Sequence, residues 1–198
     1  MERLVVARHA ESAFSVARLI SSEQAACRGL TETGREQARA LGERLRAEPI
    51  ELAITSGLRR ADETAELALQ GRDVPRLVIP ELGDIRVGDY EGGPLDEYLA
   101  WAWSHGPEER APGGGESRAD AAARFARGLR IVLGRPERTI LLVSHSLPLR
   151  YLLDAARGSD PGSRAETVPY AEAVTLAADD VEAAVERLER WSTAPAFA

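Results

Sequence analysis

Two short apolar runs, each ending at a histidine, constrain the fold of this chain more than any other feature. The first is Leu4–Ala7, which leads into Arg8 and His9, and the second is Thr139–Ser144, which leads into His145. Apolar runs of this length, rich in Val, Leu and Ile, are typical of buried strands. In open α/β sheets, ligands bind beyond the carboxyl ends of the strands. If both runs lie centrally in one parallel sheet, His9 and His145 face a common pocket.

Strands and helices are expected to alternate along most of the sequence. A first helix is predicted from Thr31 or Thr33 to Pro49 and a second over 59–69. Three further helices are predicted to begin at Pro94, at a capping box formed by Ser117 and Asp120, and near Pro148. Further strands are predicted over 51–56 and 77–79. The segment 168–191 fits either a hairpin that turns at Asp179 and Asp180 or a helix. Such alternation predicts an α/β fold of three layers, α/β/α, with a mostly parallel central sheet.

Composition excludes several classes of protein. The net charge of -7 argues against a nucleic-acid partner. All 25 basic residues are arginine, which excludes the lysine of a P-loop and Schiff-base chemistry. Cys27 is the only cysteine, so neither an intrachain disulfide nor a thiolate zinc cluster can form. No apolar run approaches the roughly 20 residues of a membrane span, so we expect no membrane partner and a cytoplasmic location.

A third strand end adds arginines to the same edge of the predicted sheet. The strand that ends at Ser56 is followed closely by Arg59 and Arg60. Histidines and arginines around one cavity suit a phosphoryl group, because the guanidinium fork matches tetrahedral oxyanions and keeps its charge. Metal binding is disfavoured, since His9 and His145 show no H-x-H or H-E-x-x-H spacing. Taken singly, a histidine after a strand is more often structural and an Arg-Arg pair more often solvated.

Six segments carry a resemblance that spans about the whole chain. They are Arg8–Ser12, Gly29–Ala38, Ser56–Ala65, Gly88–Gly92, Gly114–Ser117 and Val143–His145. In this order they resemble the motifs R-H-G-E-[ST], P-L-T-x-x-G-x-x-Q-A, S-x-L-x-R-A-x-x-T-A, G-x-[WY]-E-G, G-G-E-S and V-[ST]-H-G of the histidine phosphatase superfamily. The branch is the one similar to cofactor-dependent phosphoglycerate mutases and their phosphatase relatives. Each motif alone is weak, but six in one order are highly specific.

The resemblance implies a phosphoglycerate mutase-like fold and roles for named residues. His9 would be the nucleophile and form a phosphohistidine, with its other ring nitrogen held by a hydrogen bond, for example to a backbone carbonyl. Arg8, Arg60 and His145 would neutralise the phosphoryl oxygens as charge develops. Arg60 matches the arginine of the motif, whereas Arg59 falls at a variable position. No metal or other cofactor is expected.

The general acid departs from the family pattern. Asp84 stands where the family usually has a glutamate, and its carboxyl group is one methylene closer to the backbone. It can still protonate a leaving alkoxide. Glu81 and Glu91 are the alternative acids. We expect a single histidine phosphatase domain over 1–198, with 94–116 as a helical and loop insertion covering the active site.

Three serines are candidate substrate-binding residues. Ser15 stands where the family has a phosphate-contacting asparagine, and Ser12 is a candidate donor nearby. Ser146 replaces the glycine after the second histidine but still offers its backbone N–H. The segment Ala13–Arg28 and the insertion 94–116 are expected to set substrate specificity, although neither shows a readable code.

The function expected from the resemblance is a metal-independent phosphomonoesterase. It would hydrolyse a small phosphorylated metabolite, so its partner is a small-molecule phosphate ester. One alternative is a phosphoglycerate mutase, for which 198 residues are few. A second is a catalytically weak or inactive protein that binds a phosphate ligand, which the departures from the family motifs at Asp84, Ser15 and Ala10 motivate. A phosphatase acting on protein phosphohistidine stays open as well, and a homodimer is compatible with the sequence.

Overall fold

The structure is a computed structural model that describes residues 1–23, 28–164 and 166–197, so Cys27 lies outside the described residues. Five strands form one sheet in the order β3-β2-β4-β1-β5. They are β1 (Arg3–Arg8), β2 (Leu52–Thr55), β3 (Arg76–Val78), β4 (Thr139–Ser144) and β5 (Ala173–Ala177). Only the β1–β5 pair is antiparallel. The mostly parallel sheet with β1 beside β4 confirms the predicted arrangement.

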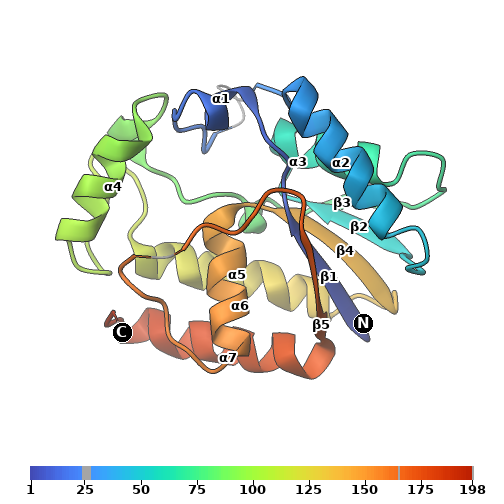
Figure 1. Cartoon of the computed structure of the whole chain (residues 1–198). Coiled ribbons are helices and arrows are strands. Elements are labelled where there is room, and N and C mark those ends of the chain that lie inside the picture. The colour runs from blue at the N-terminus through green and yellow to red at the C-terminus, as the bar shows by residue number, and fades with distance from the viewer. Residues whose placement is uncertain (24–27, 165, 198) are drawn as a thin grey trace.

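Helices cover both faces of this sheet (Figure 1). One face carries α2 (Glu32–Arg44) and α3 (Arg59–Ala68), and the other carries α5 (Arg118–Leu133), α6 (Ser146–Ala156) and α7 (Ala178–Thr193). Alternate strand residues point into the two cores, so Val5 packs toward α2 and α3 while Leu4 and Val6 pack toward α5 and α7. This is the predicted three-layer α/β/α fold.

The predicted end of the first long helix is wrong. Thr31, one of the two residues expected to begin this helix, caps α2. The helix ends at Arg44 and not at Pro49. The guanidinium of Arg72 donates to the Leu45 carbonyl at 3.0 Å. The Glu48 N–H donates to the same carbonyl at 3.0 Å, so a turn replaces the helix before the chain reaches the proline.

The ambiguous segment 168–191 is a strand followed by a helix. β5 ends at Ala177 and α7 follows directly, so Asp179 and Asp180 lie in the first turn of a helix and not in a hairpin turn. The Asp180 carboxylate accepts a hydrogen bond from the Ala177 N–H at 3.3 Å. Acidic side chains are favourable at this position, because they face the positive end of the helix dipole.

The remaining predicted boundaries are close to those observed. The capping box of Ser117 and Asp120 opens α5, and Pro148 lies in the first turn of α6. Pro94 directly precedes α4 (Leu95–Ser104). β2 is two residues shorter than predicted, and β3 begins and ends one residue earlier. Two 3₁₀ helices, η2 (Pro80–Leu82) and η3 (Gly88–Tyr90), lie between β3 and α4.

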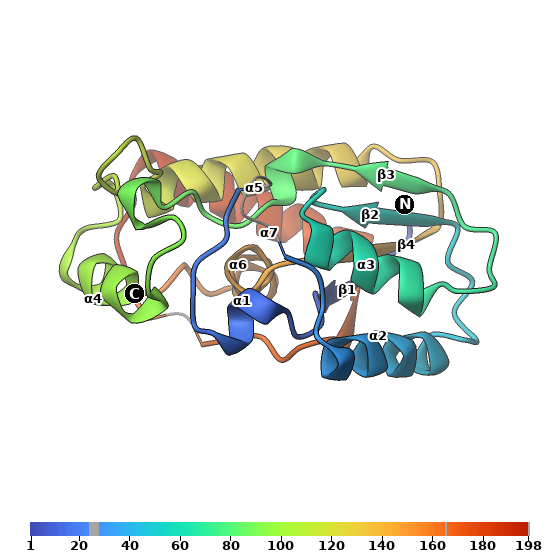
Figure 2. The ribbon, with the colours of Figure 1, turned by 90° about the horizontal axis from the view of Figure 1, so that it is seen from above.

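The helix α4 lies beyond the carboxyl ends of the strands, on the same side of the molecule as the short α1 (Ala13–Val16) (Figure 2). The Leu95 N–H donates to the Arg18 carbonyl at 2.8 Å, and the Arg18 side chain forms an ion pair with Asp96. These contacts join the start of α4 to the loop after α1. Within the described ranges, no helix combines the length and the apolar character needed to cross a membrane.

Candidate active site

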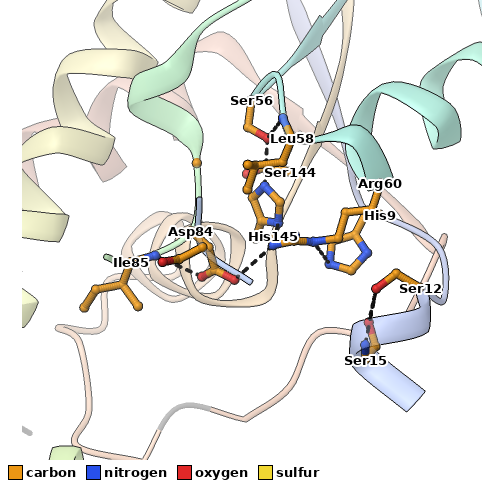
Figure 3. A network of polar contacts seen from close by, with 12 residues as sticks. His9, Ser12, Ser15, Ser56, Leu58, Arg60, Asp84, Ile85, Ser144 and His145 are labelled. Carbon is orange, nitrogen blue, oxygen red and sulfur yellow. Dashed lines mark hydrogen bonds and ion pairs between the residues drawn. The ribbon is translucent and has the colours of Figure 1, made fainter. Parts of the chain in front are cut away.

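Two adjacent strand ends bring the predicted histidines together. Arg8 of β1 pairs in register with Ser144 of β4, and the His9 N–H donates to the Ser144 carbonyl at 2.9 Å. The ring centroids of His9 and His145 are therefore only 5.2 Å apart. α3 begins just after β2 and places the Arg60 side chain between the two rings (Figure 3). The β1–β4 pairing therefore places the two histidines at the same edge of the sheet.

The imidazole of His9 has one nitrogen held by the backbone and one facing Arg60. Nδ1 lies 2.8 Å from the carbonyl oxygen of Ala10, and because a carbonyl only accepts, Nδ1 carries the proton. Nε2 therefore has a free electron pair, which accepts a hydrogen bond from Nε of Arg60 at 3.1 Å. The Ala10 N–H is in turn fixed by the Thr64 hydroxyl at 3.0 Å. The predicted backbone contact of the second ring nitrogen is present.

The surroundings of His9 favour its neutral form. The ring is buried, and burial lowers the pKa of His9 well below its ordinary value. The positive charges of Arg60 and Arg8 lower the pKa further, and the hydrogen bond to the backbone only partly opposes them. A neutral imidazole with a free pair on Nε2 is the form that can act as a nucleophile.

His145 is fixed at both nitrogens. Nδ1 lies 3.0 Å from Nη2 of Arg60, which can only donate, so the proton of His145 is on Nε2 and is donated to the Ser56 hydroxyl at 2.7 Å. Ser56 also accepts from the Leu58 N–H at 3.3 Å. Burial and then the charge of Arg60 hold the pKa of His145 well below its ordinary value. Sequence reasoning gave Ser56 no role, although a polar residue ending a buried strand was a usable signal.

Arg8 is oriented by the C-terminal part of the chain. Its Nη1 donates to the Val168 carbonyl at 2.8 Å, and its guanidinium carbon lies 3.8 Å from the centre of the Tyr170 ring. The Tyr170 ring also lies beside His9, with 5.9 Å between the ring centroids. Sequence reasoning missed Tyr170, because the segment around it showed neither a motif nor a clear periodicity.

The three predicted serines make contacts within the protein. The Ser12 hydroxyl caps α1 by accepting from the Ser15 N–H at 3.3 Å, and the two hydroxyls lie 2.6 Å apart. Figure 3 shows this pair near His9. The Ser146 hydroxyl accepts from the Val168 N–H at 3.1 Å, which ties the start of α6 to the residues that orient Arg8.

Asp84 lies on the other side of Arg60 from His9 (Figure 3). Its Oδ2 is 3.7 Å from Nη2 of Arg60, and its Oδ1 accepts from the Ile85 N–H at 3.1 Å. The side chain is 32% exposed, so the carboxyl group can reach a ligand. The alternative acid Glu91 is already engaged, because its carboxylate accepts from the backbone N–H and the hydroxyl of Ser22 at 2.9 and 2.5 Å.

Comparison with known proteins shows which family the chain belongs to. The family model of the histidine phosphatase superfamily (branch 1) matches residues 4–190. The chain belongs to this superfamily. It is 34% identical over 160 residues to adenosylcobalamin/alpha-ribazole phosphatase of Salmonella typhimurium, which covers 76% of this chain and 77% of that protein.

Two further relatives show the range of the histidine phosphatases similar to this chain. A 2,3-bisphosphoglycerate-dependent phosphoglycerate mutase of Methylobacterium is 34% identical over 190 residues, which are 87% of each chain. The crystal structure of the alpha-ribazole phosphatase from Shigella flexneri superposes with a TM-score of 0.76 at 28% identity, covering 87% of this chain and 89% of that one. These likenesses confirm both the predicted family and the predicted fold.

In this histidine phosphatase, one buried arginine holds the loop that carries Asp84. The guanidinium of Arg124 donates to the carbonyls of Glu81, Gly83 and Asp84 at 2.8, 3.1 and 2.9 Å. It also makes two bonds to the Glu116 carboxylate, at 2.7 and 2.6 Å. Burial acts to raise the pKa of Glu116, but the hydrogen bonds and charges of Arg124 and Arg86 together lower it below its ordinary value. Glu116 is the glutamate of the G-G-E-S segment, for which sequence reasoning had named no role.

A cavity of about 390 Å³ opens beside Asp84. Leu58, Val78 and Pro80 form its apolar part, while Arg86 and Arg124 are among its polar lining residues. Ser56, the partner of His145, also lines it. Among the residues that the structure describes, no three His, Cys, Asp or Glu side chains are grouped so that they could hold a metal ion.

Proposed function

We propose that this chain is a metal-independent phosphomonoesterase that hydrolyses a small phosphorylated metabolite through a phosphohistidine on His9. The observation that carries the proposal is the fixed tautomer of His9, whose Nδ1–H bonds the Ala10 carbonyl and leaves Nε2 unprotonated, with its electron pair toward Arg60. Phosphatases among the relatives support hydrolysis as the outcome. We further propose that the enzyme acts in the cytoplasm.

In the first step, Nε2 of His9 attacks phosphorus in line with the ester oxygen. A phosphoryl oxygen first takes the place of Nε2 as acceptor for Arg60, which frees the nitrogen pair. The P–N bond forms and the P–O bond of the ester breaks, and Arg8, Arg60 and His145 stabilise the charge on the phosphoryl oxygens. In the free site the one N–H of His145 bonds Ser56 and its Nδ1 accepts from Arg60, so His145 acts by orienting the guanidinium of Arg60, and the arginines supply the positive charge.

Asp84 handles the proton in both steps. In its protonated form it gives a proton to the leaving alkoxide, and as a carboxylate it then accepts a proton from a water molecule. The hydroxide attacks the phosphohistidine, the P–N bond breaks, and His9 is restored with release of inorganic phosphate. Asp84 suits this role by its position, because it lies next to Arg60 on the cavity side of the site.

Other residues around the site have supporting roles in this proposal. We propose that Ser12, Ser15 and the Ser146 backbone N–H bind phosphoryl oxygens around the arginines. The segment 94–116 is proposed to cover the site, because its start is tied to the loop after α1. The whole chain, 1–198, then works as one domain. A homodimer is compatible with this proposal, which needs no residue from a second copy.

Neither alternative function is favoured by a specific observation. A mutase is named among the relatives, but a phosphatase and a mutase share the same first step. A protein that only binds a phosphate ligand would not need the fixed tautomer of His9.

The test is hydrolysis of p-nitrophenyl phosphate by wild type and His9→Ala, with acid-labile phosphate on the intact protein measured after rapid quenching. We expect the variant to lose at least about 1000-fold in kcat and to carry no phosphate. Near-normal hydrolysis by His9→Ala would overturn the proposal. Conversion of 3- to 2-phosphoglycerate in the presence of the bisphosphate, at a rate above hydrolysis, would favour the mutase instead.

A further inference from the structure

The guanidinium of Arg8 is held by one backbone carbonyl and one aromatic ring. Nη1 donates to the Val168 carbonyl at 2.8 Å, and the guanidinium carbon lies 3.8 Å from the centre of the Tyr170 ring. Within the described residues, the buried Nε of Arg8 has no hydrogen-bond partner. A single hydrogen bond leaves a guanidinium free to turn about that bond, so the ring of Tyr170 is the contact that fixes its plane.

Arg60, the second arginine of the site, is held in a different way. Its Nε donates to His9 at 3.1 Å and its Nη2 donates to His145 at 3.0 Å. The same Nη2 lies 3.7 Å from the Asp84 carboxylate, whereas Arg8 forms no ion pair in the part of the chain that the structure describes. The two arginines of the site therefore have different means of orientation, and only that of Arg8 depends on an aromatic side chain.

The backbone next to Tyr170 is strained. Ala171 has a φ of 50°, in the left-handed region that favours glycine and is unfavourable for a residue with a Cβ atom. Two bonds hold it there: its N–H donates to the Arg8 carbonyl at 3.0 Å, and its carbonyl accepts from Arg44, at the end of α2, at 2.5 Å. Strained positions that the surrounding structure enforces cluster at functional sites, so this one points to its neighbour Tyr170.

The result of this backbone path is that the Tyr170 ring lies against the phosphoryl side of the site. Arg8 and Tyr170 form an isolated β-bridge, which sets the two residues side by side. The ring centroid of Tyr170 is also 5.9 Å from that of His9. A cation over an aromatic face is attracted by the ring, and the attraction grows when water is excluded from the pair. Tyr170 can therefore hold Arg8 without occupying its remaining N–H donors.

We propose that Tyr170 is a positioning residue for Arg8: the face of its ring fixes the plane of the guanidinium, so that the donors not used by Val168 point toward the phosphoryl oxygens. The inference rests on the proposed function, in which Arg8 binds these oxygens. Tyr170 takes no part in the chemistry itself. Because every phosphate ester presents the same phosphoryl group, its effect should be the same for aryl and alkyl esters.

The first test removes the ring and then restores it without the hydroxyl. Tyr170→Leu should lose about 10- to 30-fold in kcat/KM on both p-nitrophenyl phosphate and glycerol 3-phosphate, while Tyr170→Phe should stay within about threefold of wild type. Glu172→Gln, an exposed position in the same segment, is the control and should change neither rate. Equal losses in Tyr170→Phe and Tyr170→Leu would overturn the inference, because the ring face would then not be what acts.

A double-mutant cycle tests whether Tyr170 acts through Arg8. In an Arg8→Met background, Tyr170→Leu should cost less than about twofold in kcat/KM, because the group that it positions is absent. A residue that only supports the fold would cost the same in both backgrounds. The same factor with and without Arg8 would therefore overturn the inference, and urea unfolding of each variant shows that the rates compared are those of folded protein.

Binding of orthovanadate, an oxyanion shaped like phosphate, tests the same contact without turnover. Calorimetric titration should give a Kd about tenfold weaker for Tyr170→Leu than for wild type, and nearly unchanged for Tyr170→Phe. Equal affinity of wild type and Tyr170→Leu, or no binding to wild type, would overturn the inference. The proposed function fails separately, if wild type hydrolyses neither ester although vanadate binding follows the expected order.

Discussion

His9, Arg60 and His145 lie at the ends of packed strands or at the start of a helix that follows one, whereas Asp84 lies on a loop. In the first group, side chains bond one another and the rings are buried. Asp84 makes one bond to its own neighbour's N–H, and the backbone of its loop is held from outside by Arg124. The phosphoryl side of the site, with His9, Arg60 and His145, is therefore fixed by the sheet. The leaving-group side, with Asp84, is held by the hydrogen bonds of one buried arginine, Arg124.

This difference separates two kinds of chemistry. Every phosphate ester presents the same phosphoryl group, so a rigid site built on strand ends serves all substrates. The leaving group differs between substrates, and only a poor leaving group needs a proton. Changes on the phosphoryl side should then reduce hydrolysis of all esters, whereas changes on the loop should reduce hydrolysis of alkyl esters selectively.

The largest effect is expected from Arg60→Met. The variant removes donors from both histidines and from the phosphoryl oxygens, so kcat/KM should fall by about 1000-fold on p-nitrophenyl phosphate and on glycerol 3-phosphate alike. Arg59→Met is the matched control, since Arg59 is the exposed neighbour at the same helix start, and it should change rates by less than about threefold. A loss confined to the alkyl ester would contradict the division of the site into two sides.

Asp84→Asn should separate the two esters most clearly. Without a proton donor, hydrolysis of glycerol 3-phosphate should fall by about 100- to 1000-fold, while p-nitrophenyl phosphate, whose leaving group is stable as an anion, should lose less than about tenfold. Glu81→Gln, in the same loop, is the control and should leave the ratio of the two rates unchanged. If both esters lose equally in Asp84→Asn, another group is the acid.

Arg124→Met should weaken the loop and the fold together. Leaving the Glu116 carboxylate buried without its partner is expected to cost about 3–5 kcal/mol in the free energy of unfolding. At a temperature where the variant is folded, the alkyl ester should lose about tenfold more than the aryl ester, because Asp84 is no longer held in place. Arg130→Met removes only exposed ion pairs of the same helix, with Glu182 and Glu189, and should leave the free energy of unfolding nearly unchanged. Urea unfolding and the two hydrolysis rates check both parts.

The same comparison explains what could be predicted from the sequence. His9, His145 and Arg60 follow strands whose apolar runs are readable, so their meeting at one sheet edge could be predicted. The family motifs then selected Arg60 over Arg59 and supplied the expected roles. The contact of His9 with a backbone carbonyl was also expected, because a fixed tautomer needs such an acceptor.

The parts that were missed depend on contacts between distant segments. Ser56 reaches His145 across 89 positions of the chain, and Tyr170 reaches Arg8 from a segment without periodicity. Arg124 could be predicted only as part of a helix. Its neighbours along the chain do not indicate that its side chain bonds three carbonyls of another loop. Side chains that act through long-range packing leave no local pattern, whereas strand ends do.

The smallest effect is a dependence of stability on pH that comes from the two histidines of the phosphoryl side. His9 and His145 both have a pKa lowered well below the ordinary 6.5, so the folded state keeps them neutral while the unfolded chain binds protons as the pH falls below that value. Their contribution is fully present above about pH 6.5 and is lost as the pH falls toward the lowered pKa values. In that window the free energy of unfolding should decrease by about 1.4 kcal/mol per pH unit for each histidine. The free energy of unfolding, measured in urea between pH 7.5 and 5.5, should therefore depend less steeply on pH in His9→Gln than in wild type. The dependence should be least steep in the double variant with His145→Gln. Equal pH dependence in all three proteins would show that burial and the surrounding arginines do not hold the two rings neutral.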